Sequence, residues 1–413
     1  MSSFKLPYNS NRAFSAIYMN FREFLCFILI ALGYIYYICS MEGSMRFVPT
    51  GCIRSGMILG KTIYNASGEM LLCEGKEVIP LYIERLYSLG INGVYVDDII
   101  SKDIEIQNVV SDEVRQKAVQ GVKKILVHSV NDNASEKAAA VDQAKQIVEE
   151  IMAEILRNNN LMVNMVDLKV FDEYTYYHSV NVAVLSSVVG VAIGMNQNDL
   201  FALGLAALLH DLGKVFLDKN TINKPGQFSE EELHDVQRHS EMGYSYLRSM
   251  FDVPVKSSLG VLHHHERYNG SGYPKGLKGA EISLFGRIIA VADVFDALVS
   301  DRPYRKALLP SDAMEHIMGN GCIHFDPDIA RIFSMKIAPY PLGTAVELSN
   351  SCVGLVTENY EGFGLRPSVK IISERGKTVT PYVINLLTDM NCLNITITGI
   401  SPLSEDVVNE EAG

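Results

Sequence analysis

Apolar residues follow two different spacings along this chain of 413 residues. Over residues 165–335 they return every three or four positions, which is typical of helices with one buried face. Residues 336–402 change to short runs rich in β-branched residues, parted by Gly, Asn and Pro. The pattern therefore predicts a mainly α fold, in which an all-helical domain at 165–335 precedes a small β-rich domain at 336–413 with a frayed tail.

A smaller unit of mixed character precedes the helical part. Residues 45–105 contain two β-like runs around a turn at Asn65–Gly68, then the helical stretch "PLYIERLYSLG" and a closing strand "NGVYVDD". This order predicts a small α+β domain.

Residues 106–164 are polar with a helical periodicity and predict a helical linker of one or two helices. Two interpretations remain open: a connecting helix packed on its neighbours, which we favour, and a helix that dimerises for signalling.

The first 44 residues form a leader with an apolar run at 24–39. This run of 16 residues is shorter than the ~20 that a spanning helix needs. One hypothesis is an upstream extension from a misassigned start codon, with the folded protein beginning at Met45. The other is a membrane anchor. The intact mass of the native protein decides between them, because a mass that includes the leader contradicts the first.

Net charge and cysteine content limit the classes of partner and the cellular compartment. A net charge of −12 argues against a nucleic-acid polymer as partner, which needs a basic footprint, but it allows a small anionic ligand. Seven scattered cysteines without a CxxC pair indicate reduced thiols and a cytoplasmic protein.

Seven of the ten histidines lie between residues 178 and 265. His178 falls on the apolar face of its predicted helix, and His210 with Asp211 ends a strongly apolar one. A carboxylate in such surroundings is costly unless it is paired or binds a cation. Lys214 follows next to this pair, and Gly213 is expected to let the helix end.

The later histidines are not equivalent. His234 and His239 are five positions apart and do not share a helix face, so we expect one of them to be solvated. In "HHHERYNGSGYPKG", consecutive helical residues diverge by ~100°, so three histidines cannot all reach one ion. His264 and His265 continue the core face, and His263 falls off it.

The remaining candidate site residues are two aspartates and two arginines. Asp293 and Asp296 lie inside an apolar helix, so at least one should meet a cation. Arg302 and Arg305 suit phosphate oxygens, although a surface turn is the alternative. Histidine and carboxylate ligands without thiolate suit catalytic iron, manganese or zinc, and two such ions can clamp a phosphate. The residues alone therefore predict a metal-dependent phosphohydrolase.

The motifs "LLHDLGK" and "HHERYNGSGYPKGL" resemble those of HD-GYP domains, the HD-superfamily phosphohydrolases that cleave cyclic di-GMP. The resemblance covers about residues 165–335, and the motifs between them occur in the family's order. It implies an HD-superfamily catalytic domain with these metal ligands: His178, His210, Asp211, His239, His264, His265 and Asp293.

Further roles follow from the same resemblance. Asp211 and Lys214 would be catalytic, and Lys214, Tyr273, Arg302 and Arg305 would bind the substrate. The family holds iron or manganese. Tyr174 stands where three-metal members carry a glutamate, which favours two ions, although Glu173 is adjacent. Asn269 replaces the more usual Asp of the loop, a mild change in a turn.

The resemblance implies a phosphodiesterase that converts cyclic di-GMP to linear pGpG, with GMP as a further product, in bacterial signalling. Two alternatives stay open: a degenerate sensor of cyclic di-GMP, and a phosphohydrolase for another cyclic dinucleotide or nucleotide. Diguanylate cyclases, other signalling proteins and a second copy of the chain are candidate partners. The input signal, the oligomeric state and the metal in vivo are not set by the sequence.

Overall fold

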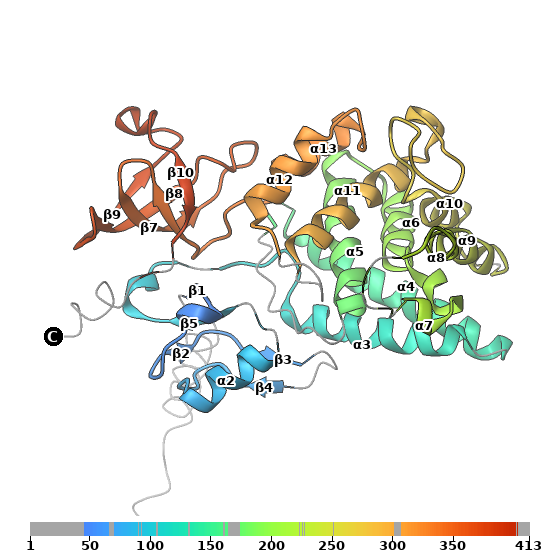
Figure 1. Ribbon diagram of the computed structural model, residues 1–413, viewed down its shortest axis with the longest axis horizontal. Helices are drawn as coiled ribbons and strands as arrows, with labels where there is room; N and C mark the ends of the chain where they lie inside the picture. Colours follow the sequence, from blue (N-terminus) through green and yellow to red (C-terminus); the bar gives the residue numbers. More distant parts are fainter. Residues whose placement is uncertain are drawn as a thin grey trace, which may run out of the picture. The chain divides into compact units, whose positions relative to one another are not determined.

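The computed structural model describes residues 45–403 apart from 66–69, 90, 92, 105, 131–132, 160–161, 164–173, 223, 225, 227, 251, 301–306 and 402. The apolar leader, the centre of the expected turn after Asn65, Glu173, and both Arg302 and Arg305 lie outside the described residues. Figure 1 shows the arrangement of the described elements.

The first part of the chain forms small antiparallel sheets with one helix. A three-stranded sheet has the order β1-β5-β2, and β3 pairs with β4. Pro80 begins the helix, where its missing N–H costs no hydrogen bond. The elements are β1 (Arg46–Pro49), β2 (Ile58–Leu59), β3 (Ile63–Tyr64), β4 (Met70–Leu72), α2 (Pro80–Ser88) and β5 (Gly93–Asp97).

Two long helices follow, α3 (Asp112–Ser129) and α4 (Ala134–Arg157). The Ser111 side chain caps α3 by accepting the Val114 N–H. Glu154 of α4 in turn accepts hydrogen bonds from the backbone N–H and hydroxyl of Ser111, at 2.6 and 2.9 Å. The start of α3 is thereby fixed to the last turns of α4.

The rest of the helical part contains the predicted histidines and aspartates. Ser229 and Glu232 form the N-terminal capping box that their spacing predicts for α8. The elements are α5 (Tyr174–Ala192), α6 (Gln197–Leu208), η4 (Leu212–Phe216), α7 (Lys219–Ile222), α8 (Glu230–Gln237), α9 (His239–Arg248), α10 (Val255–His263), η5 (Gly279–Glu281), α11 (Leu284–Val299), α12 (Pro310–Gly319) and α13 (Pro327–Lys336).

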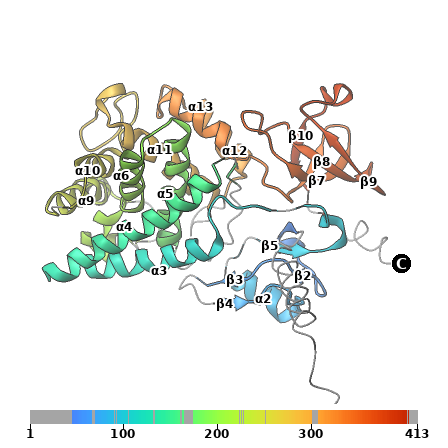
Figure 2. The same ribbon diagram turned by 180° about the vertical axis from the view of Figure 1, so that it is seen from behind.

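One continuous apolar core joins α3 and α4 to these helices. Val122 of α3 and Ile151 of α4 are as fully buried as Leu185 of α5 and Leu203 of α6. Both ribbon views show α3 and α4 side by side next to α5 and α6 (Figures 1 and 2). The residues predicted as a linker therefore contribute to the same core as the helices after residue 174.

The last part is an antiparallel five-stranded sheet with the order β10-β6-β7-β8-β9. Its elements are β6 (Ala345–Leu348), β7 (Cys352–Glu358), β8 (Ser368–Glu374), β9 (Lys377–Asn385) and β10 (Ile397–Ile400). The structure confirms the predicted mainly helical part, with smaller sheets before and after it in the sequence. Within the described ranges, no helix combines the length and apolarity needed to cross a membrane.

Candidate metal centre

Three histidines of the centre lie at the ends of helices. α6 ends at Leu208 just before His210, His239 follows the end of α8 and begins α9, and His264 follows the last residue of α10. All three side chains are at most 1% exposed. The helix ends therefore bring imidazoles that are distant in sequence to one buried point.

The same hydrogen bond orients each of these three rings. Nδ1 donates to the carbonyl three residues earlier, at 2.8 Å from His210 to Ala207, 2.7 Å from His239 to Val236 and 2.6 Å from His264 to Val261. These carbonyls belong to the last turns of helices, where carbonyls lack the regular partner four residues later. Each ring thus caps a helix end, and its Nε2 lone pair faces the centre.

The inward-facing atoms fit a cation. Nε2 of His239 and of His264 are 3.3 Å apart, and with both Nδ1 atoms protonated neither Nε2 can donate to the other. Among the described residues, His210 Nε2 and Asp211 Oδ1 are also buried without a hydrogen-bond partner. Buried lone pairs of this kind are costly unless a donor or a metal ion meets them.

Asp211 connects two groups of ligand atoms. One group is Asp211, His239, His264 and His265, and the other is His178, His210 and Asp211; within each group the ligand atoms lie within 4.8 Å of one another. Asp293 of α11 adds a carboxylate at 3.1 Å from Nε2 of His178. The described residues thus bring together all seven ligands that the resemblance implies, with one shared carboxylate.

Electrostatics keep both carboxylates charged. Burial raises the pKa of Asp211, but the charge of Lys214 is the largest of the opposing effects that hold that pKa well below its usual value. Burial likewise raises the pKa of Asp293, and the hydrogen bond and charge of His178 reverse this effect. Two anionic carboxylates in a buried site are the ligand state that a divalent cation requires.

The histidines divide into two classes. Burial lowers the pKa of His239 and, together with neighbouring imidazoles, holds that of His264 well below 6.5; burial also lowers the pKa of His265 to about 3. Burial lowers the pKa of His178 too, but its hydrogen bonds with Asp293 and Asp296 raise it to about 9. Three rings are therefore neutral as ligands must be, and His178 must release a proton to bind a cation.

Gly213 has a different role from the one expected. It does not end α6, which already ends at Leu208. A Cβ at this position would lie 1.8 Å from the carbonyl oxygen of His239, so the absence of a side chain lets η4 approach α9 closely. This approach places Asp211 beside His239, with 3.5 Å between Oδ1 and Nε2.

Lys214 and Tyr273 lie next to the candidate ligands. Lys214 Nζ is 2.6 Å from Asp211 Oδ2, and its side chain is 37% exposed, so part of the ammonium group faces solvent. The Tyr273 ring lies over His265 at 4.7 Å between centroids. Burial, with the charges of Asp211 and Asp293, raises the pKa of Tyr273, so its hydroxyl remains a donor.

Glu266 holds the loop that carries Tyr273. It is 1% exposed, and its carboxylate accepts the backbone N–H groups of Lys275 at 2.8 Å and Leu277 at 3.0 Å. The Tyr273 N–H donates to the His265 carbonyl at 3.2 Å. The loop is thus fixed at both sides of Tyr273 to the segment that carries the ligand histidines.

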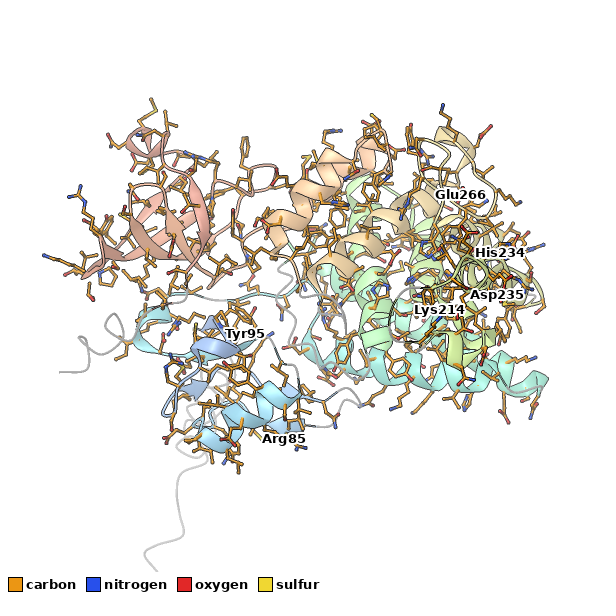
Figure 3. The ribbon with its side chains drawn as sticks, in the orientation of Figure 1. Arg85, Tyr95, Lys214, His234, Asp235 and Glu266 are labelled. Atoms are coloured by element: carbon orange, nitrogen blue, oxygen red, sulfur yellow. The ribbon has the colours of Figure 1, made fainter. Side chains whose placement is uncertain are left out.

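The other predicted positions are also located. His263 is buried away from both ligand groups, and its Nδ1 accepts the Ser283 N–H at 3.2 Å. His234 is exposed on α8, and Figure 3 labels it with Lys214 and Glu266 in the helical part. Tyr174 begins α5.

Two functional candidates were not recognised from the sequence. Asp296 is fully buried and bonds to His178 Nδ1 at 2.7 Å, whereas the sequence showed only that one of two aspartates should meet a cation. Glu266 lies in the motif "HHERYNGSGYPKGL", but the motif alone implies no role for it. A carboxylate inside an apolar helix was the available signal for Asp296, but its partner lies 118 residues away.

Comparison with known proteins concerns the segment that carries these residues. Residues 150–329 match the family described as HD domain. This match covers less than half of the chain. Its matched segment begins within α4, so the HD domain includes the last turns of that helix.

Curated relatives of the HD domain include cyclic dinucleotide phosphodiesterases. The chain is similar to a cyclic di-GMP phosphodiesterase of Pseudomonas aeruginosa, with 37% identity over 66% of this chain and 66% of that protein. It is also similar to 3′3′-cGAMP-specific phosphodiesterase 1 of Vibrio cholerae, with 41% identity over 40% of this chain and 37% of the relative. The chain therefore matches less than two thirds of the length of either relative.

One solved structure similar to this chain is an HDG"Y"P protein from Bdellovibrio bacteriovorus. The similarity covers 70% of this chain and 98% of the other, at 15% identity and a TM-score of 0.40.

Proposed function

We propose that the chain is a metal-dependent phosphodiesterase that hydrolyses cyclic di-GMP to linear pGpG, with GMP as a further product. The observation that carries the proposal is the pair of buried ligand groups that share Asp211. A shared carboxylate between buried histidines suits two divalent ions. Iron and manganese are the proposed metals, because the resemblance to HD-GYP domains implies them and a ligand set of imidazole and carboxylate without thiolate suits them.

The residues then have distinct roles. His178, His210 and Asp293 would hold one ion, His239, His264 and His265 the other, and Asp211 would bridge them. Ions bound here supply Lewis acidity to a phosphoryl group and lower the pKa of a water molecule.

Lys214 places a positive charge at the edge of the centre, where negative charge develops on the phosphate. Tyr273 offers a neutral hydroxyl from the loop, so it can donate to the substrate without repelling it. Arg302 and Arg305 are proposed as further contacts to the second phosphate. The centre belongs to a segment proposed to function in the cytoplasm, where cyclic di-GMP is found.

A matched set of variants tests the proposal. The full chain, loaded with Mn²⁺ or with Fe²⁺ without oxygen, should linearise cyclic di-GMP, and chromatography identifies pGpG or GMP. The double variant His210→Ala with Asp211→Ala should lose turnover, whereas His234→Ala, which changes an exposed histidine, should retain it. Equal turnover in the wild type and the double variant contradicts the metal mechanism. Tight cyclic di-GMP binding without turnover in the loaded wild type would indicate a sensor.

A second candidate substrate is 3′3′-cGAMP, favoured by the 41% identity to the Vibrio cholerae relative of that name. Rates measured on one metal-loaded preparation with cyclic di-GMP, 3′3′-cGAMP and cyclic di-AMP decide between the two. A higher kcat/KM for 3′3′-cGAMP than for cyclic di-GMP would replace the first substrate by the second.

A further inference from the structure

A series of buried, hydrogen-bonded side chains runs from α3 to the metal centre. Arg115 Nη1 donates to Asn181 Oδ1 at 2.8 Å, and Asn181 Nδ2 donates to Asp296 Oδ1 at 2.9 Å. The other oxygen of Asp296 lies 2.7 Å from His178 Nδ1. All four side chains are at most 8% exposed. This series of hydrogen bonds thus links three helices, α3, α5 and α11, through side chains alone.

Each member suits the position it occupies. Asn181 uses both ends of its amide, accepting from a cation and donating to an anion, so its orientation is set by the two charges. Asp296 accepts on both oxygens, and His178 Nδ1–H can donate only to such an acceptor. A buried guanidinium is costly unless it is hydrogen-bonded, which makes its presence in α3 informative.

His178 differs from the ligand histidines at the helix ends. Those three rings are oriented by carbonyls of their own helices, three residues away. The Nδ1 of His178 is instead bonded to a side chain of another helix, and that side chain is bonded in turn to Asn181. The orientation of His178 therefore depends on how α3, α5 and α11 pack together.

We propose that Arg115 is a positioning residue for His178, which acts through Asn181 and Asp296, and that it couples α3 to the metal centre. This inference rests on the proposed function, because it takes His178 as a metal ligand. Arg115 lies before residue 150, where the match to the HD domain begins, so the coupling extends the centre into the segment that precedes this domain.

The proposed coupling leads from the start of α3 to the metal centre. Arg115 is one turn into α3, and Ser111 at the start of this helix is fixed to Glu154. α3 is the first long helix after the small sheets. A displacement of its first turn moves the guanidinium away from Asn181, frees Asp296 from one of its donors and loosens the His178 ring. Weaker metal binding at the centre follows from that loosening.

Mn²⁺ titration of the metal-free full chain by calorimetry tests the coupling. Arg115→Met, which keeps most of the apolar stem, should weaken Mn²⁺ binding about tenfold, since residues that orient ligands typically contribute 10–100-fold in affinity. Arg115→Lys, which keeps a cation that can reach the amide, should recover most of that loss. Lys117→Met, on the exposed side of the same helix, should bind like the wild type.

The outcomes separate the two proposals. If the wild type binds Mn²⁺ and hydrolyses the dinucleotide, while folded Arg115→Met binds Mn²⁺ equally well, the coupling is wrong and the proposed function stands. If the wild type binds Mn²⁺ without turnover and Arg115→Met binds it about tenfold more weakly, the coupling stands and the proposed activity fails. Should Arg115→Met not fold, Asn181→Ser provides a second test, because it removes the amide that bonds both Arg115 and Asp296 and adds no bulk. A wild-type Mn²⁺ affinity in Asn181→Ser would overturn the coupling.

Discussion

At the scale of single residues, the orientation of the imidazoles decides what the centre can bind. In His210, His239 and His264, Nδ1 donates to a backbone carbonyl, which leaves Nε2 as an acceptor in a buried site. His263 does the reverse, because its Nδ1 accepts a backbone N–H from Ser283. Neighbouring histidines in one motif therefore have opposite hydrogen-bonding roles.

This difference predicts opposite outcomes for two alanine variants. His264→Ala should lose bound metal, because it removes an inward-facing Nε2. His263→Ala should keep metal and activity but lower the free energy of unfolding by about 1–3 kcal/mol, since the Ser283 N–H loses its acceptor. Elemental analysis and urea unfolding measure both effects. Equal metal loss in the two variants would contradict this division.

Glu266 predicts a selective effect on substrate binding. Glu266→Gln has one carbonyl oxygen in place of two carboxylate oxygens, so it can no longer hold both the Lys275 and Leu277 N–H groups. The loop with Tyr273 should loosen, and KM for the dinucleotide should rise several-fold, while metal content stays at the wild-type level. Steady-state kinetics with elemental analysis measure this, and a fall in metal content with unchanged KM would show that Glu266 supports the ligands instead.

At the scale of elements, the close approach of η4 and α9 sets the distance between ligands. This approach exists because Gly213 carries no side chain. Sequence alone indicated only that a glycine follows the His-Asp pair, and helix termination was the wrong reason for it. The physical cause lies in α9, which begins 26 residues later and whose packing no local pattern reports.

Gly213→Ala should therefore be severe. The added Cβ would collide with the His239 carbonyl, and overpacking of this kind costs about 1–3 kcal/mol or more. Metal content should fall as Asp211 and His239 separate. Gly319→Ala is the matched control, because its Cβ meets open space at the end of α12. Thermal unfolding and elemental analysis of both variants provide the test, and equal results for the two would refute the close-approach argument.

At the scale of the whole molecule, the sequence predicted the types of element better than their partners. Helical and β periodicities, the capping box of Ser229 and the mainly α class follow from local spacing, and the structure agrees with them. The seven ligand candidates also came from motifs, and the described residues bring them together.

Contacts between distant segments could not be predicted. Periodicity in α4 indicates a buried face, but it does not say which helix covers that face. The pairing of Asp296 with His178 and Asn181 joins positions more than 100 residues apart, which only the packing of α5 against α11 produces. The sequence accordingly predicts helices packed on their neighbours in residues 106–164, but it does not predict that these neighbours are α5 and α6.

This shared core predicts that α4 and the helices after residue 174 unfold together. Ile151→Ala, at a site 1% exposed, should lower the free energy of unfolding by about 2–5 kcal/mol in one cooperative transition. Leu156→Ala, where the side chain is 39% exposed, should cost clearly less. Urea unfolding followed by circular dichroism measures both. An unchanged transition of the helices after residue 174 in Ile151→Ala would mean that α4 is a separate unit.

The helix-capping bonds of His210, His239 and His264 also bear on how such a centre can change over generations. Each ring satisfies a carbonyl at a helix end as well as facing the ligand site. A descendant that lost its metals would still be destabilised by replacing these histidines. Selection for folding alone would therefore retain them. A complete set of these histidines in a relative is thus evidence of a stable fold, and it does not by itself show that the relative turns over a substrate.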